Sequence, residues 1–192
     1  MQEGEYEAEL ARAREVQGQI AASIPDELKR QEDQLPTTII RQSGVSAYTL
    51  LGRFYAFMDQ LYGSFSGLVT CRKGCHYCCA LNEIVIFELE ILYLERYAGK
   101  RRLVRPRKRE EIANMPCPFL TDGACSIYEF RPYICRKHFS LSSSTWCEPS
   151  VSNEYDFPLI SFTGVEEAFG HILQKSGKVR VRDIREVFGR SD

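Results

Sequence analysis

A run of four cysteines within nine residues, CRKGCHYCC, constrains this chain more than any other feature of its sequence. The four are Cys71, Cys75, Cys78 and Cys79, which stand closer together than side-chain packing requires. Thiolates crowded in this way repel one another unless a cation neutralises them, and adjacent thiols without a metal or a disulfide are an oxidation hazard. The run therefore predicts metal ligands, a disulfide network or a nucleophile.

Chain length and apolar content narrow these alternatives. The 192 residues are enough for one domain with its own hydrophobic core, so small size does not explain eight cysteines. The first thirty residues contain no apolar stretch of signal-peptide length, and no later run approaches the ~20 residues of a membrane span. We therefore expect a cytoplasmic protein without a membrane partner. In a reducing compartment, metal ligands or catalytic thiols are favoured over disulfides.

The charge of the chain gives little reason to expect nucleic acid as a partner. A net charge of −1 produces no overall field that would attract a polyanion. The local exception is residues 100–110, where seven of eleven positions are Lys or Arg. Because no aromatic residue is interleaved with these cations, we interpret the stretch as a solvated linker. A protein partner stays open.

The hydrophobic pattern predicts a mostly α-helical fold with small β elements. Residues 82–87, NEIVIF, are a short β-like run. The segments with helical spacing are 4–22, a short one opening at Ser23 or Pro25, 44–66, 88–99, 164–177 and 181–189. In the helix expected at 44–66, Ser46 is the predicted N-cap and Gly63 the predicted stop.

The second cysteine region, residues 117–138, contains a turn signal. Asp122-Gly123 stands between the apolar stretches PFL and CSIY, a pattern typical of a β-hairpin. Cys117 and Cys125 should then lie near the two ends of a tight turn. Many thiolate sites present two ligands in this way, and Cys135 follows ten residues after Cys125.

The number of cysteines leaves both the metal and the number of sites open. Eight thiols could complete two four-ligand sites, or one site with spare thiols. Zinc binds four tetrahedral ligands at about 2.0 to 2.3 Å, whereas an iron–sulfur cluster takes cysteines on a larger frame. Both accept all-cysteine ligation. The crowded run favours a cluster, since zinc sites usually show two separated C-x2-C pairs.

The spacing Cys71-x3-Cys75-x2-Cys78 resembles the cluster-binding motif of radical S-adenosylmethionine enzymes. Those enzymes follow the motif with a long alternating β/α barrel. Here only 113 residues follow Cys79, and they contain no repeated strand–helix units. The resemblance therefore implies similar ligand spacing without that enzyme.

A broader resemblance runs from about Cys71 to Arg136. CRKGCHYCC, then CPFL, then DGACSIYEFRPYICR resemble, in order, the motifs of the CxxCxxCC family, which is described as zinc- or iron-chelating. The resemblance implies a small, mostly helical domain, and the relatives include flagellin lysine methylases. The metal-site residues that it implies are Cys71, Cys75, Cys78, Cys79, Cys117, Cys125 and Cys135.

Other residues near these motifs have weaker assignments. Cys147 lies outside the resembling block and is either an additional ligand or a buried thiol. Arg131 and Arg136 flank Cys135, where guanidinium donors could offset thiolate charge through N–H···S contacts. Tyr128 is expected to pack over the site. The three histidines are left off the predicted ligand set.

These inferences predict a metal-binding protein that holds zinc or an iron–sulfur cluster through clustered cysteines. The expected organisation is an N-terminal helical arm, residues 1–43, followed by a compact, mostly helical metal-binding domain, residues 44–192. Two other classes stay open. One is a metal- or cluster-dependent enzyme, either group-transfer (methyltransferase-like) or redox, and the other is a structural adaptor whose metal only stabilises the fold. No acid–base pair, phosphate loop or nucleophile triad is recognisable, so no catalytic residue is predicted.

Overall fold

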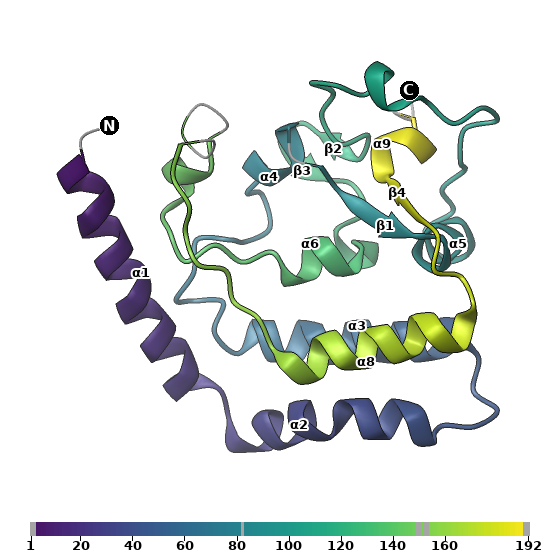
Figure 1. Ribbon diagram of the computed structural model, residues 1–192, viewed down its shortest axis with the longest axis horizontal. Coiled ribbons are helices and arrows are strands. Elements are labelled where there is room, and N and C mark those ends of the chain that lie inside the picture. Colours follow the sequence, from purple (N-terminus) through teal and green to yellow (C-terminus); the bar gives the residue numbers. More distant parts are fainter. Residues whose placement is uncertain (1–2, 82, 149–150, 152–153, 190–192) are drawn as a thin grey trace.

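The computed structural model describes residues 3–81, 83–148, 151 and 154–189 (Figure 1). Its longer helices are α1 (Glu3–Ser23), α2 (Asp26–Arg41), α3 (Ala47–Gly63), α5 (Glu88–Tyr97) and α8 (Thr163–Ser176). Short helices are α4 (Tyr77–Leu81), α6 (Tyr133–Lys137) and α9 (Ile184–Val187), with 3-10 turns η1 (Arg109–Glu111), η2 (Tyr128–Phe130) and η3 (Ser144–Cys147). The strands are β1 (Val85–Phe87), β2 (Leu120–Thr121), β3 (Ala124–Cys125) and β4 (Val181–Asp183). The predicted mostly helical fold with small β elements is confirmed. None of the described helices is long and apolar enough to cross a membrane.

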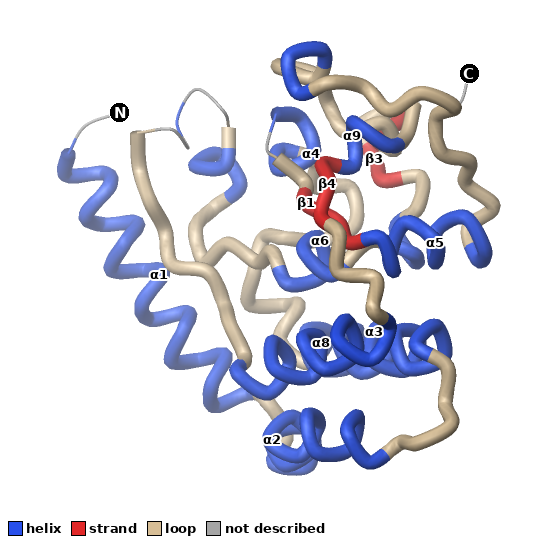
Figure 2. The backbone as a smooth tube through the Cα atoms, turned by 45° about the vertical axis from the view of Figure 1, so that its right-hand side comes forward, coloured by secondary structure: helices blue, strands red, loops and turns tan. Residues whose placement is uncertain are grey.

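Helices α2, α3 and α8 form the helical base of the molecule, with α8 in contact with both of the others (Figure 1). Helix α1 runs along one side of the protein, and its C-terminal end lies next to the start of α2 (Figure 2). Its buried residues join the same hydrophobic cluster as those of α3 and α8. This helical cluster consists of the buried apolar side chains of α1, α2, α3 and α8 with Ile24, Phe65, Leu89, Tyr133, Phe139, Leu141 and Ile160. The division at residue 44 stays a prediction.

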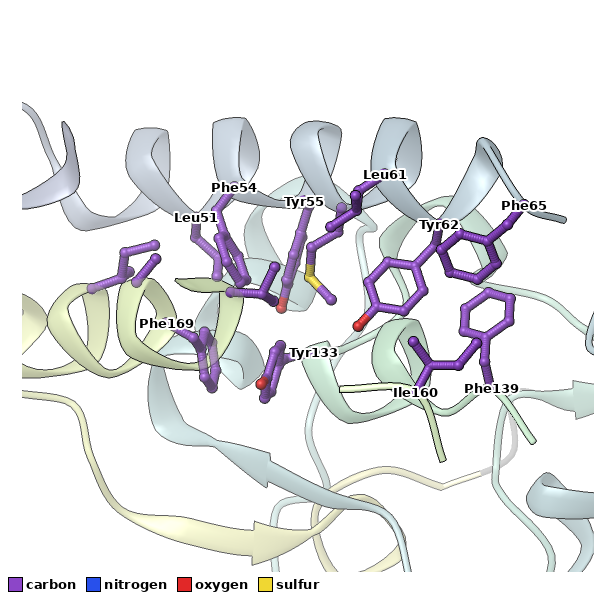
Figure 3. Packing of buried hydrophobic residues seen from close by; sticks show 14 of the residues in the cluster. Leu51, Phe54, Tyr55, Leu61, Tyr62, Phe65, Tyr133, Phe139, Ile160 and Phe169 are labelled. Carbon is purple, nitrogen blue, oxygen red and sulfur yellow. The ribbon is translucent and has the colours of Figure 1, made fainter. Parts of the chain in front are cut away.

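The large apolar side chains of α3 recur every three or four residues, so they share the inward face of the helix. Several of them are aromatic. Phe54 stacks near Phe169 of α8, and Tyr62 stacks on Phe139 with ring centroids 4.9 Å apart (Figure 3). The hydroxyl of Ser46 accepts a hydrogen bond from the Thr49 N–H, and the helix ends at Gly63. Both predicted boundaries of this helix are confirmed.

The strands belong to a second cluster around two small antiparallel sheets. β1 pairs with β4, and β2 pairs with β3. In the β2–β3 turn Asp122 and Gly123 have φ values of 49° and 74°, the left-handed pair that a tight hairpin turn requires. The predicted hairpin is therefore confirmed. This hairpin cluster consists of Ile84, Ile86, Ile91, Leu94, Cys117, Phe119, Ile127, Ile184, Val187 and Phe188.

Several element boundaries differ from the prediction. The helix expected over 181–189 is wrong for its first three residues, which form β4 opposite β1. Asp183 then caps the short α9 by accepting the Arg185 N–H. β4 pairs with a strand almost a hundred residues earlier in the chain. Such a distant pairing leaves no signal in the neighbouring sequence, so the spacing of the apolar residues predicted a helix instead. The strand expected at 82–87 spans only 85–87, and residue 82 lies outside the described residues. The second helix extends to Arg41 rather than being short.

Glu90 of α5 is a buried carboxyl group that joins the two clusters. Its oxygens accept hydrogen bonds from the Tyr55 hydroxyl (2.6 Å), the Tyr133 N–H (2.7 Å) and the Phe87 N–H (3.0 Å). Burial raises the pKa of Glu90, and these hydrogen bonds with the nearby charge of Arg136 oppose the shift. The carboxyl therefore ties α3, β1 and α6 to α5.

Gly164 should tolerate no side chain, because a Cβ built there would lie 2.2 Å from the Glu32 carbonyl oxygen of α2. We expect Gly164→Ala to lower the free energy of unfolding by about 1–3 kcal/mol through overpacking, as measured by urea denaturation. Gly170 is the matched control on the same helix, since a Cβ built there would meet no neighbouring element of the described chain within 4 Å. Gly170→Ala should be neutral or stabilising by up to about 1 kcal/mol. Equal effects of the two substitutions would contradict the close α2–α8 approach.

Glu90 should make the protein less stable as pH rises, which is the opposite of the usual effect of a carboxylate. The pKa of Glu90 is raised in the folded protein. The stabilisation that Glu90 provides is therefore fully present below the ordinary carboxyl pKa and is lost as pH rises through the pKa of Glu90 in the folded protein. The unfolding free energy of the wild type relative to Glu90→Gln should therefore fall as pH increases from about 4.5.

Glu95, on the same helix, provides the control of opposite sign. The Arg102 hydrogen bond lowers the pKa of Glu95, so the wild-type advantage over Glu95→Gln should be present at neutral pH and lost on acidification. Urea denaturation at several pH values measures both differences. A pH-independent difference for Glu90→Gln would contradict the raised pKa.

Candidate metal centre

The seven cysteines predicted to bind metal all line one cavity, which we call the cysteine cavity and which has a volume of about 210 Å³. Its wall also contains Phe139 of the helical cluster and Ile84, Ile127 and Ile184 of the hairpin cluster. The cavity therefore lies where the two clusters meet. The fold brings the two cysteine regions of the sequence together at this junction.

The first cysteine run spans the boundary between the clusters. Cys71 packs against the helical cluster, whereas Cys79 packs against the hairpin cluster. Between them the Cys75 N–H donates to the Arg72 carbonyl (2.9 Å), and Gly74 has a φ of 98°, which favours glycine. Helix α4 follows this turn. The turn explains how thiols close in sequence reach different parts of the cavity wall.

The β2–β3 hairpin positions the next two thiols. The Leu120 N–H donates to the Cys117 carbonyl (3.0 Å), and Leu120 pairs with Cys125 across the hairpin. The Cys117 N–H in turn donates to the Cys79 carbonyl (2.8 Å), which ties the hairpin to α4. The predicted placement of Cys117 and Cys125 near the two ends of the turn is confirmed.

Helix α6 carries the seventh thiol. It begins after Pro132, whose fixed φ suits the start of a helix. Tyr133 packs in the helical cluster, while Cys135 lines the cysteine cavity and packs against the hairpin cluster. This short helix therefore turns neighbouring residues toward both clusters.

The segment after α6 carries Cys147, the one described cysteine that does not line the cavity. The Ser140 N–H donates to the Cys71 sulfur (3.3 Å). The hydroxyls of Ser140 and Ser142 share a hydrogen bond (2.7 Å), and the Ser142 oxygen lies 4.0 Å from the Cys147 sulfur. Two serines thus stand between Cys71 and Cys147.

Burial disfavours the thiolate form of most cavity cysteines. It raises the pKa of Cys117 to about 11 and that of Cys71 to about 12. For Cys78 the hydrogen bond to the Cys79 thiol is the largest cause of a raised pKa, followed by burial. Desolvation is also the main cause of the raised pKa values of Cys75, Cys125 and Cys135. Without a cation, these thiols are protonated at neutral pH.

Seven of the eight thiols fall into two sets by their mutual electrostatic influence, and the eighth, Cys79, shares a hydrogen bond with Cys78. In the first set, every pair interacts and each charge disfavours the thiolate of its neighbour. The members of this first set are Cys78, Cys117, Cys125 and Cys135. In the second set, Cys147 and Cys75 both disfavour the thiolate of Cys71, and Cys147 also disfavours that of Cys75. Cys78 also acts on both Cys71 and Cys75, so it lies between the sets.

The two arginines predicted beside the site occupy different positions. Arg131 and Tyr128 both line the cavity, and the Arg131 guanidinium lies 3.9 Å from the centroid of the Tyr128 ring. The positive charge of Arg131 favours the thiolate form of Cys125. Arg136 is only 2% exposed and donates to two backbone carbonyls and to Asp59. Arg131 is thus on the cavity wall, whereas Arg136 lies in the packing around α6.

His138 lines the cavity, although the ligand set predicted from the sequence omits it. Burial lowers its pKa, so its imidazole is neutral at pH 7 and able to act as a ligand. The spacing Cys135-x2-His138 is the signal that could have identified it. His76, by contrast, stacks on Tyr77 with ring centroids 5.3 Å apart.

The donor set fits a thiophilic metal by its chemistry. Seven thiols and one imidazole line a single cavity, and all eight cysteines are free of disulfides. In the described part of the chain, however, no group of three or more His, Cys, Asp or Glu side chains is arranged to hold a metal ion. The thiols surround a volume rather than converging on one point.

Metal binding by these thiols should release protons. Because the pKa of Cys117 is about 11 and most other cavity thiols are shifted in the same direction, each ligand carries a proton at pH 7 that it must lose. We expect about one proton per ligand thiol, and an affinity that weakens as pH falls. Calorimetric titration with zinc in two buffers of different ionisation enthalpy counts the protons. Zinc binding without proton release would contradict the raised pKa values.

Comparison with known proteins gives one match. Residues 70–157 match the family model CxxCxxCC, described as "Putative zinc- or iron-chelating domain". The matched range contains all eight cysteines, including Cys147. No curated protein and no solved structure matches the chain.

Proposed function

From the match of residues 70–157 to the CxxCxxCC family model, we propose that the protein holds an iron–sulfur cluster in the cysteine cavity. The ligands in this proposal are Cys78, Cys117, Cys125 and Cys135. All four line the cavity, and an electrostatic interaction links each pair of them. A bound cluster supplies either a redox centre or a covalent cross-link between segments.

The observation that supports a cluster over zinc is that the thiols surround a cavity. A zinc ion needs its sulfur ligands about 2.3 Å from one centre. No three potential ligands within the described residues have such an arrangement, while seven thiols line about 210 Å³. A cluster distributes its cysteine ligands over several iron atoms, so its ligands surround a volume.

The placement of the proposed ligands on separate segments supports a structural or electron-transfer role. The proposed ligands come from α4, the β2–β3 hairpin and α6, so a cluster would join three separate segments. We include a reducing, cytoplasmic setting in the proposal because all eight thiols are free.

Anaerobic purification tests the cluster directly. We expect brown protein containing iron and acid-labile sulfide, and we expect Cys125→Ser to lose most of both because it removes a ligand. Thr121→Ala is the matched control, since Thr121 is an exposed residue of the same hairpin. It should retain the wild-type iron and sulfide content. Colourless protein with stoichiometric zinc and no iron after anaerobic handling would refute the cluster.

The structural role makes a separate prediction about metal removal. Because the cluster would join segments at the junction of two hydrophobic clusters, its removal by an iron chelator should lower the midpoint of thermal unfolding. Far-UV circular dichroism measures the helices, and the absorbance of the cluster measures its loss. An unchanged midpoint after complete loss of iron would contradict the structural role while leaving the cluster assignment intact.

A further inference from the structure

A second pocket lies outside the cysteine cavity, and we infer that it binds the phosphate group of a phosphomonoester. We call it the arginine pocket, and its volume is about 280 Å³. The charged residues of its wall are Arg102, Arg180, Arg182 and Glu88. The two cavities share no lining residue in the described part of the chain. Binding at the arginine pocket therefore does not depend on the proposed cluster.

The basic run at residues 100–110 is held against the C-terminal segment. The Leu103 N–H donates to the Val187 carbonyl (2.8 Å), and the Arg107 N–H donates to the Glu186 carbonyl (2.9 Å). The Arg107 guanidinium donates to two more backbone carbonyls of the same segment. The run therefore forms a fixed wall of the arginine pocket rather than a free linker.

The β1–β4 pairing brings the other two arginines to this wall. Arg180 and Arg182 are two residues apart in extended chain, so their side chains leave the strand on the same side. The Arg180 carbonyl accepts a hydrogen bond from the Glu88 N–H (2.8 Å), and Arg182 lies opposite Ile86 in the register with β1. Arginines from two distant parts of the sequence thus meet at one pocket.

The guanidinium groups of the pocket retain free hydrogen-bond donors. Arg102 uses three of its five N–H groups, two for Glu95 and one for Glu88, so two donors remain. Arg182 makes one long ion pair, at 3.5 Å. The Arg180 side chain makes no hydrogen bond or ion pair with any described residue. The carboxylates fix the orientation of Arg102, while Arg180 is available to a ligand.

The electrostatic environment of the pocket favours an anion. Three carboxylates, those of Glu88, Glu95 and Glu186, offset the arginines of the wall. However, residues 100–111 carry seven cations against two carboxylates. The cations of this run that make no ion pair with a described residue are Lys100, Arg101, Arg105, Arg107 and Lys108. A ligand that enters the pocket therefore meets a positive local field.

A phosphomonoester fits this wall better than a carboxylate does. It carries close to two negative charges at neutral pH and has three acceptor oxygens, enough for several guanidinium forks at once. The apolar residues of the wall, Leu103, Pro106 and Val187, offer contacts for the carbon atoms beside the phosphate. No aromatic residue lines the described pocket, so no nucleobase can stack there. The phosphate group can belong to a soluble metabolite or to a lipid headgroup.

Two probes with the same headgroup test the pocket. Glycerol 3-phosphate is titrated into the full chain in a calorimeter, and phosphatidylcholine vesicles with phosphatidic acid are used for co-sedimentation. We expect binding to at least one probe, and we expect Arg180→Gln to weaken it by at least about tenfold because a charged donor is lost. Arg109→Gln is the matched control and should keep the wild-type affinity. Arg109 belongs to the same run but pairs with Glu83 and does not line the pocket.

The results distinguish the two sources of phosphate from general surface charge. Binding in solution identifies a free metabolite, and binding only to vesicles identifies a lipid headgroup. No binding of either probe, or no greater loss for Arg180→Gln than for Arg109→Gln, would refute the pocket. Equal affinity for vesicles of phosphatidylglycerol, a phosphodiester, or for an RNA oligonucleotide would also refute it, because both report general attraction to polyanions.

The iron content separates this pocket from the proposed cluster. Arg180 is exposed, so Arg180→Gln should fold and should retain the iron and sulfide of the wild type. Cys125→Ser should show the reverse pattern, with iron lost and the affinity for the phosphate probe retained. Loss of phosphate binding in Cys125→Ser would refute the independence of the two sites.

Discussion

The buried carboxyl group of Glu90 is the interaction on which the junction of the two hydrophobic clusters depends. Helix α5 sends Leu89 to the helical cluster and Ile91 to the hairpin cluster, so Glu90 lies between them. An isolated buried charge costs several kcal/mol. Three hydrogen bonds, from α3, β1 and α6, offset that cost here. The same bonds set how these elements meet, and one of them positions the N-terminus of the helix that carries Cys135.

The junction that Glu90 organises is also where the thiols are desolvated. Burial protects them from solvent but disfavours their ionisation, as the pKa of Cys117 near 11 indicates. A cation reverses this balance, because it replaces the lost hydration of the thiolates with direct bonds. Under the proposed function, folding and metal binding would therefore be coupled through the same few residues. The packing brings the thiols together, and a bound metal would stabilise the packing.

The sequence predicted those features that depend on local chemistry. The α3 boundaries follow from Ser46 and Gly63, and the hairpin follows from Asp122-Gly123, because each signal acts within a few residues. The strand pairing of β1 with β4 depends on contacts between distant segments and was missed. For the same reason, the sequence identified the cavity thiols but could not reveal that Ile184, from the C-terminal segment, shares their wall.

Helix α1 is hydrogen-bonded to the segment that ends in Cys147. The Arg12 guanidinium donates to the Leu141 carbonyl, and the Glu9 carboxylate accepts from the Ser143 N–H. Their partners are backbone groups, whose need for hydrogen bonds is independent of side-chain identity. Residues 138–148, which follow α6, contain the 3-10 turn η3 but no longer helix or strand that would satisfy such groups internally. Helix α1 supplies two of these bonds instead, and it thereby ties this segment to the helical cluster.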